Sequence, residues 1–248
     1  MTPIEHCRGT AVPPGSARYY ALVNAMPSTR PALSVVFALA DETRKLARLS
    51  TQTLEVRQAK LGWWAEEVNR LRDARPRHPV MLACVQYALP VERVGAVFQC
   101  AIRWGLTSRI AQMSALEEFC VGTGGALGEV AGKLCVALDG DVGRAAADIG
   151  TGAQLFDFAS ESDDDHTLIR GAYERADDLL ARGDGCVAGA DRYRLLPLLT
   201  LGTLHRYSMS RLRKVESPGT AATPPWTPLR RLWITWRLAR SEKKRLKS

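Results

Sequence analysis

Residues 60–71, with the sequence KLGWWAEEVNRL, constrain the fold more than any other stretch of this chain. The apolar residues recur at the spacing of one helix face, and they are Leu61, Trp64, Ala65, Val68 and Leu71. The charged residues fall away from that face, and they are Glu66, Glu67 and Arg70. The pattern predicts an amphipathic helix that ends before the proline-containing segment PRHPV at 76–80. We expect Trp64, Val68 and Leu71 to be buried in the core.

The rest of the chain also has the periodicity of helices, and no segment alternates like a strand. Ser28 or Thr29 is expected to cap one helix, and Ser114 with Glu117 has the spacing of a capping box. The fold class is therefore all-α. The further helices are predicted at 17–26, 31–49, 80–89, 91–104, 114–138, 144–160, 166–183 and 191–215.

A length of 248 residues, 46% of them hydrophobic, suits one large domain with a sizeable core. We expect a loose N-terminus (1–16), one helical domain (17–215), a proline-rich linker (216–228) and a basic amphipathic helix (229–248). No apolar run approaches the roughly 20 residues of a membrane span, and the opening residues have no signal-peptide pattern. We therefore expect a cytoplasmic protein. Neither the six Cys nor the four His have the spacing of zinc ligands.

The Trp-Trp segment with PRHPV after it resembles the squalene and phytoene synthase family, the head-to-head prenyl diphosphate synthases, as bacteria carry it. Phe119-Cys120, Gly125 and Gly128 look like the family's Tyr-Cys-x-x-x-Ala-Gly-x-x-Gly segment. The resemblance covers roughly residues 17–240. It implies an isoprenoid synthase-like helical bundle with a central cavity, and a ligand that is an isoprenoid diphosphate or another apolar lipid.

A second matching segment carries acidic residues on one helix face. The family pattern Gly-x-x-x-Gln-Leu-Thr-Asn-x-x-Arg-Asp-x-x-x-Asp is matched here by Gly150, Gln154, Leu155, Asp157, Glu161 and Asp165. The resemblance implies that Asp157, Glu161 and Asp165 hold Mg²⁺ against the substrate diphosphate if the protein is active. From the residues alone, a solvated turn that caps the next helix is the preferred interpretation of the aspartates at 163–165.

The opposite wall departs from the family. Where the first aspartate motif belongs, the chain has Arg44, Lys45 and Arg48, and we expect Arg44 or Arg48 to pair with Asp157, Glu161 or Asp165 in place of a bridging metal. Asp41 and Glu42, one turn earlier, are either a displaced metal site or solvated charges on an exposed turn. A downstream motif that serves the diphosphate is reduced to Arg170 and Tyr173.

Three glycines four residues apart, Gly124, Gly128 and Gly132, form a smooth stripe on one helix. Glycine inside a helix costs about 1 kcal/mol relative to alanine, so the stripe needs a reason. The spacing around Gly132 does not fit a phosphate-binding loop. The stripe fits the close approach of another helix or of an elongated apolar ligand.

The formal net charge of +8 lies almost wholly at the C-terminal end, because residues 226–248 hold eight Lys or Arg and a single acid, Glu242. Leu229, Leu232, Trp233, Trp236 and Ala239 fall on one side of the predicted helix. Such a basic amphipathic helix suits an anionic membrane surface, here the inner membrane. It is equally consistent with a terminal helix docked on the core. No recognition motif accompanies the charge, so we expect no nucleic-acid partner.

The resemblance implies either a working enzyme or a catalytically degenerate relative. The replacement of the first aspartate motif by Arg44, Lys45 and Arg48 favours the second. We expect a catalytically degenerate member that binds a prenyl lipid or an unidentified protein partner near a membrane, comparable with relatives that assist respiratory-complex assembly. The alternative is a working prenyltransferase that condenses farnesyl or geranylgeranyl diphosphate with Mg²⁺.

Overall fold

Helices make up all the regular structure in the described part of the chain, and the predicted all-α class is confirmed. The structure is a computed structural model that describes every residue except 107–111, 137–139, 162–165, 213–226 and 247–248. Its elements are α1 (Pro3–Ala11), α2 (Ala17–Val23), α3 (Arg30–Ala47), η1 (Arg48–Thr51), α4 (Leu54–Arg72), α5 (Pro79–Gln86), α6 (Val91–Gly105), α7 (Met113–Cys120), η2 (Val121–Gly125), α8 (Ala126–Cys135), α9 (Gly140–Ser160), α10 (His166–Cys186), α11 (Gly189–Arg194), α12 (Leu196–Leu212) and α13 (Pro228–Arg245).

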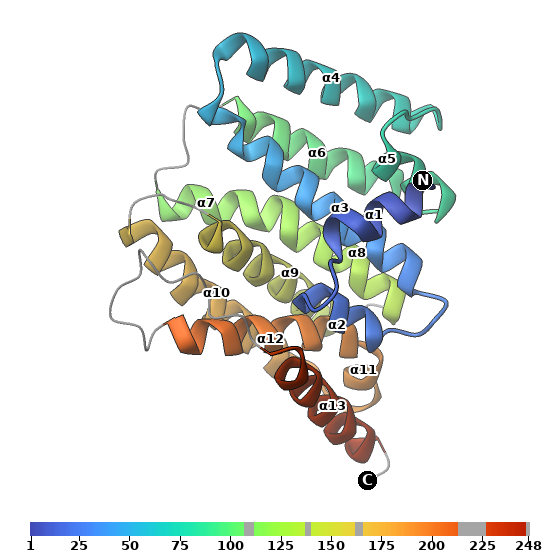
Figure 1. Cartoon of the computed structure of the whole chain (residues 1–248), viewed down its shortest axis with the longest axis vertical. Helices are drawn as coiled ribbons and strands as arrows, with labels where there is room; N and C mark the ends of the chain where they lie inside the picture. The colour runs from blue at the N-terminus through green and yellow to red at the C-terminus, as the bar shows by residue number, and fades with distance from the viewer. Residues whose placement is uncertain (107–111, 137–139, 162–165, 213–226, 247–248) are drawn as a thin grey trace.

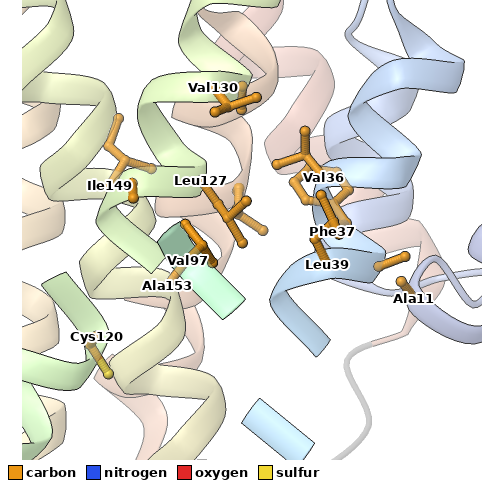
Figure 2. Packing of buried hydrophobic residues seen from close by; sticks show 14 of the residues in the cluster. Ala11, Val36, Phe37, Leu39, Val97, Cys120, Leu127, Val130, Ile149 and Ala153 are labelled. Atoms are coloured by element: carbon orange, nitrogen blue, oxygen red, sulfur yellow. The ribbon is translucent and has the colours of Figure 1, made fainter. Parts of the chain in front are cut away.

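The helices are stacked along the long axis of the molecule (Figure 1). Helices α4, α5 and α6 lie at one end, α3, α7, α8 and α9 cross the middle, and α11 and α13 lie at the other end. Helix α9 packs against α8 and α10, and α3 packs against α1, α6 and α8. Figure 2 shows Val36 and Phe37 of α3 facing Leu127 and Val130 of α8 across the core. The middle layer therefore brings α3 and α9 within reach of each other.

The predicted core face of the Trp-Trp helix, α4, is confirmed at Trp64, Val68 and Leu71, which are all buried. The Trp64 ring, 8% exposed, stacks on Phe98 of α6 with 4.8 Å between ring centroids. Ala65 was placed on this face by its spacing but is exposed. Trp63 is 39% exposed, so the adjacent Trp residues have different environments.

Glu67 corrects the sequence prediction, because it is fully buried although the pattern places it off the core face. Its Oε1 accepts hydrogen bonds from the backbone N–H groups of Arg77, at 2.5 Å, and His78, at 2.6 Å. Arg70 donates to its Oε2 at 3.0 Å. The carboxylate thus satisfies backbone donors in the PRHPV segment as the chain enters α5, which compensates its burial.

The N-terminus expected to be loose contains α1, which packs against α3 and α5. Thr2 and Glu5 form a capping box at its start, so a start signal was present in the sequence but missed. The cap predicted at Ser114 is wrong, because Ser114 lies inside α7. Thr29 is the N-cap residue of α3 as predicted, but its hydroxyl donates to the Met26 carbonyl and accepts no hydrogen bond from the helix.

The predicted helix 191–215 is divided at Leu195 into α11 and α12, and Pro197 lies in the first turn of α12, where its missing N–H is not needed. Leu198, Leu201 and His205 of its predicted stripe are buried. Met209 is buried as well. Helix α12 packs against α2, α9 and α10.

Helix α13 is docked on the body and packs against α2, α11 and α12. Ile234 is buried between Tyr20 and Leu204, and the Tyr20 hydroxyl donates to the Pro228 carbonyl at 2.8 Å. Within the described residues, no helix combines the length and the hydropathy needed to cross a bilayer.

Candidate functional site

The candidate site lies between α3 and α9, which form its two walls, and Arg44 of α3 contacts carboxylates of both helices. Its Nη2 donates to Asp41 at 2.8 Å, and its Nη1 donates to Asp157 of α9 at 3.1 Å. Its Nε and Nη2 also contact the two oxygens of Glu161 at 3.0 and 2.9 Å, which is a bidentate pair. Charge-assisted bonds of this geometry are the strong ones. One buried guanidinium therefore donates hydrogen bonds to three carboxylates, one from α3 and two from α9.

Arg18 of α2 reinforces the same carboxylates. Its Nη1 donates to Asp41 Oδ1 and its Nη2 to Asp157 Oδ2, each at 2.5 Å. The Arg18 guanidinium also lies over the Phe37 ring, 5.8 Å from the centroid. Arg18 was not among the predicted site residues. The available signal was that Arg18 is the only charged residue of α2, in a segment whose other residues are apolar or aromatic.

Arg48 completes the cluster at its outer edge. Its Nη1 donates to Glu161 at 2.9 Å, and its Nη2 donates to the carbonyl of Phe158 in the last turn of α9 at 3.0 Å. The predicted pairing of Arg44 or Arg48 with the acids of α9 is confirmed at Asp157 and Glu161, whereas Asp165 lies outside the described residues. We call this group the ionic cluster, and its members are Arg18, Arg44, Arg48, Asp41, Asp157 and Glu161.

The ion pairs of the cluster favour the charged forms of Asp157 and Arg44. Burial alone would raise the pKa of Asp157, but Arg18 and Arg44 lower it below its ordinary value. Burial would lower the pKa of Arg44, but the surrounding carboxylates raise it above its ordinary value. Three guanidinium groups thus balance three carboxylates, and the cluster has no net charge.

His205 of α12 lies against the inner side of the cluster. Its ring packs on Phe156 with 4.4 Å between centroids, and its Nε2 is 4.0 Å from Asp157 Oδ1. That nitrogen is buried and has no hydrogen-bond partner among the described residues. Burial lowers the pKa of His205 to about 4, although Asp157 opposes the shift. The imidazole is therefore neutral near pH 7.

A narrow apolar crevice runs from the cluster into the core, between α2, α3, α8, α9 and α12. Its volume is about 40 Å³, whereas pockets that hold drug-sized ligands measure about 300–1,000 Å³. Gln154 lies on its wall, where its Nε2 donates to Thr123 at 2.7 Å and its buried Oε1 has no partner among the described residues. A larger hollow of about 300 Å³ lies between α4 and α6, and no member of the cluster lines it.

The model of the squalene/phytoene synthase family matches residues 13–173, well over half of the chain. The chain belongs to the squalene/phytoene synthase family. Among solved structures, a dehydrosqualene synthase in complex with a ligand is similar with a TM-score of 0.74, at 13% identity over 98% of this chain and 97% of that one. An identity this low shows the fold, not the activity. A comparison with curated proteins finds no match. The predicted isoprenoid synthase-like fold is confirmed.

The remaining acids of this family member do not fit a magnesium site. Asp157 Oδ2 accepts from Arg18 and Arg44, and both Glu161 oxygens accept from arginines. Mg²⁺ demands near-octahedral oxygen ligands and keeps several waters. A divalent cation that used Asp157 Oδ2 or either Glu161 oxygen would have to displace guanidinium groups from it. In the ranges that the structure describes, no three His, Cys, Asp or Glu side chains are grouped as metal ligands.

Three residues that resemblance placed at the site have other positions. Lys45 points away, with 60% of its side chain exposed, and pairs with Glu42. Arg170 is 83% exposed and pairs with Glu174 one turn along α10. Tyr173 is half-buried behind Phe156, where burial raises its pKa to about 12.

The exposed-turn interpretation of Asp41 and Glu42 is wrong, because both are buried within α3. Asp41 belongs to the ionic cluster, where Arg18 and Arg44 compensate its charge. Glu42 accepts from Lys45 at 2.6 Å.

The glycine stripe serves helix packing. A methyl group on Gly128 would lie 2.2 Å from the Ala146 carbonyl oxygen, and one on Gly150 would lie 2.2 Å from that of Gly124. A methyl group on Gly125 would meet the Thr151 hydroxyl at 2.6 Å. Of the two explanations left open by the sequence, the close approach of another helix applies, and that helix is α9. Gly128 also borders the crevice through its backbone.

Gly150→Ala is therefore expected to lower the free energy of unfolding by about 1–3 kcal/mol, because α8 and α9 must move apart. Gly62→Ala is the control, since nothing lies within 4 Å of the added methyl group in the middle of α4. It should stabilise the protein by about 0.5–1 kcal/mol. Urea denaturation measures both, and equal stability of Gly150→Ala and wild type would show that this contact is loose.

Proposed function

We propose that this protein is a non-catalytic member of the squalene/phytoene synthase family. The observation that carries the proposal is the position of Arg44, which lies where the family has its first aspartate motif. From there it donates hydrogen bonds to both Asp157 and Glu161. Direct ion pairs thereby take the place of metal-bridged contacts between the two walls.

The charge balance supports this proposal. A diphosphate that leaves an allylic carbon develops negative charge, and catalysis needs excess positive charge aimed at it. The ionic cluster offers three cations that are already neutralised by three carboxylates. Binding a diphosphate would require breaking these pairs, which leaves buried carboxylates next to an added anion.

We propose further that the protein acts as an accessory protein at the cytoplasmic face of a membrane, through residues 229–248. The crevice walls, formed by residues such as Val36, Phe37, Leu198 and Leu201, suit a prenyl chain or another apolar lipid tail. Its volume of about 40 Å³ means that such a chain enters only if the surrounding helices separate. The proposed ligand is therefore an uncharged or weakly polar lipid, not an isoprenoid diphosphate.

The test is incubation of the full chain with farnesyl or geranylgeranyl diphosphate and Mg²⁺, followed by lipid extraction and analysis. We expect no squalene-type, phytoene-type or cyclopropyl product above a boiled sample. An active dehydrosqualene synthase verifies the assay. A thermal-shift series with inorganic diphosphate and Mg²⁺ gives a second readout, and we expect no rise in melting temperature, because a ligand that binds only the folded state would stabilise it.

Product formation would overturn the proposal in favour of a working head-to-head prenyltransferase. So would a rise in melting temperature that requires Mg²⁺ and diphosphate together, because it would show that the cluster opens to form a metal site.

A further inference from the structure

The most apolar side of α13 is not the side that docks on the body. Leu229 is 77% exposed, and the two tryptophans Trp233 and Trp236 are 51% and 53% exposed. These positions advance by four and three residues and therefore share one face, with Leu232 beside them. The docked side carries Ile234, Thr235 and Glu242 instead. An exposed Trp pair on an otherwise folded helix needs an explanation.

Cations lie over this exposed face. The Arg237 guanidinium is 5.4 Å from the centroid of the Trp233 ring, and that of Arg240 is 5.1 Å from Trp236. Lys243 and Lys244 are exposed one turn further on. We call this surface the Trp–Arg face, and its members are Leu229, Leu232, Trp233, Trp236, Arg237 and Arg240.

Buried ion pairs fix the direction of the Trp–Arg face. Glu242 is almost fully buried and accepts from Arg192 of α11 at 3.0 and 3.2 Å. Arg192 also donates to Asp184 at 2.7 Å, which ties the end of α10 to the same point. At the other end, Arg231 donates to the carbonyl of Gly15. The helix is therefore held at both ends, and the face points away from the body.

We propose that the Trp–Arg face binds the interface of an anionic phospholipid bilayer while α13 stays docked. This rests on the proposed membrane association and assigns it to one surface. Tryptophan prefers the boundary between headgroups and acyl chains, and each basic residue near an anionic surface adds attraction.

Charge complementarity selects this partner over two others. A second copy of the chain would bring two strongly basic helices together, so their charges would repel. A nucleic acid would contact the cations but leave the central Leu and Trp side chains without apolar contact.

The experiment is co-sedimentation of the full-length protein with vesicles of phosphatidylcholine alone or mixed with phosphatidylglycerol. Wild type should bind the mixed vesicles and lose binding as salt rises. Trp233→Ser/Trp236→Ser should weaken binding at least tenfold. Arg237→Gln/Arg240→Gln should weaken it about 30-fold, the factor for two basic residues at about 1 kcal/mol each.

Matched controls carry the same chemistry elsewhere. Trp63→Ser removes an exposed Trp from α4, and Arg144→Gln/Arg170→Gln removes two exposed arginines, so neither should change binding by more than about twofold. Thermal melts should show that both Trp–Arg face variants remain folded, because their side chains are exposed. Point substitutions are preferable to truncation, since removing α13 would uncover Tyr20 and leave Arg192 without Glu242.

Several outcomes would overturn the inference. If wild type binds but both Trp–Arg face variants bind equally well, the protein associates with membranes through another surface, and the proposed membrane association stands without this assignment. If wild type does not bind, both fail, while the proposal of a non-catalytic protein is still judged by the product assay. Equal binding to neutral vesicles, or self-association in sedimentation velocity that the Trp variant abolishes, would also overturn it.

Discussion

Replacing Arg44 with Met is expected to lower the free energy of unfolding by about 3–5 kcal/mol. The substitution keeps most of the apolar length of the side chain but removes the guanidinium that contacts Asp41, Asp157 and Glu161. Asp41 and Asp157 then remain buried with only Arg18 to compensate them. Urea denaturation followed by circular dichroism measures the change.

Two further substitutions are compared with Arg44→Met by the loss of unfolding free energy. Arg170→Met removes an exposed pair with Glu174 and should cost less than about 0.5 kcal/mol. Arg48→Met, at the partly exposed edge of the cluster, should fall between the two. A cost below about 1 kcal/mol for Arg44→Met would mean that water already compensates the carboxylates, and that the two walls are not locked.

The pH dependence of the Arg44 effect has a definite sign. Burial opposes ionisation of Asp157, yet Arg18 and Arg44 hold its pKa below the ordinary value in the folded protein. The stabilisation is thus complete above the unfolded pKa of about 4 and is lost as pH falls through the lower folded value. The difference between wild type and Arg44→Met should therefore be largest near pH 7 and shrink below about pH 4.

Charge complementarity predicted one part of this cluster, the pairing of Arg44 or Arg48 with the acids of α9. Arg44 and Arg48 replace acids at positions that the family resemblance places opposite Asp157 and Glu161, so an ion pair was the simplest expectation. Arg18 was not found, because it is 139 residues from Asp157 and no local spacing relates them. Such contacts depend on where α2 packs against α12 and α3, which helix periodicity does not specify.

Within single helices, periodicity likewise did not predict contacts with residues of other segments. It identified the buried face of α4 at Trp64, Val68 and Leu71, but it could not foresee that Glu67 would be buried to accept the N–H groups of a loop. For α13 it identified the apolar side but not which side docks. The buried Glu242 decides that, because its partner Arg192 belongs to α11.

Trp64→Ala is the second substitution with a large expected effect, a loss of about 3–5 kcal/mol of unfolding free energy. The indole fills the space between α4, α5 and α6, where it stacks on Phe98 and packs on His78 with 4.7 Å between centroids. Removing it leaves a cavity and ends both aromatic contacts. Because α6 packs on α3, which carries Arg44, the loss of the Trp64 indole should also loosen the packing beside the ionic cluster.

Trp63→Ala is the matched control, since this neighbouring indole is 39% exposed and should cost less than about 1 kcal/mol. The difference between the two variants isolates burial from the chemistry of the side chain. If both cost less than about 1 kcal/mol, α4 packs loosely and the Trp-Trp segment is peripheral to the core. If both variants lose about 3–5 kcal/mol, the partly exposed Trp63 contributes as much to stability as the buried Trp64. The assignment of a core role to Trp64 alone would then be wrong.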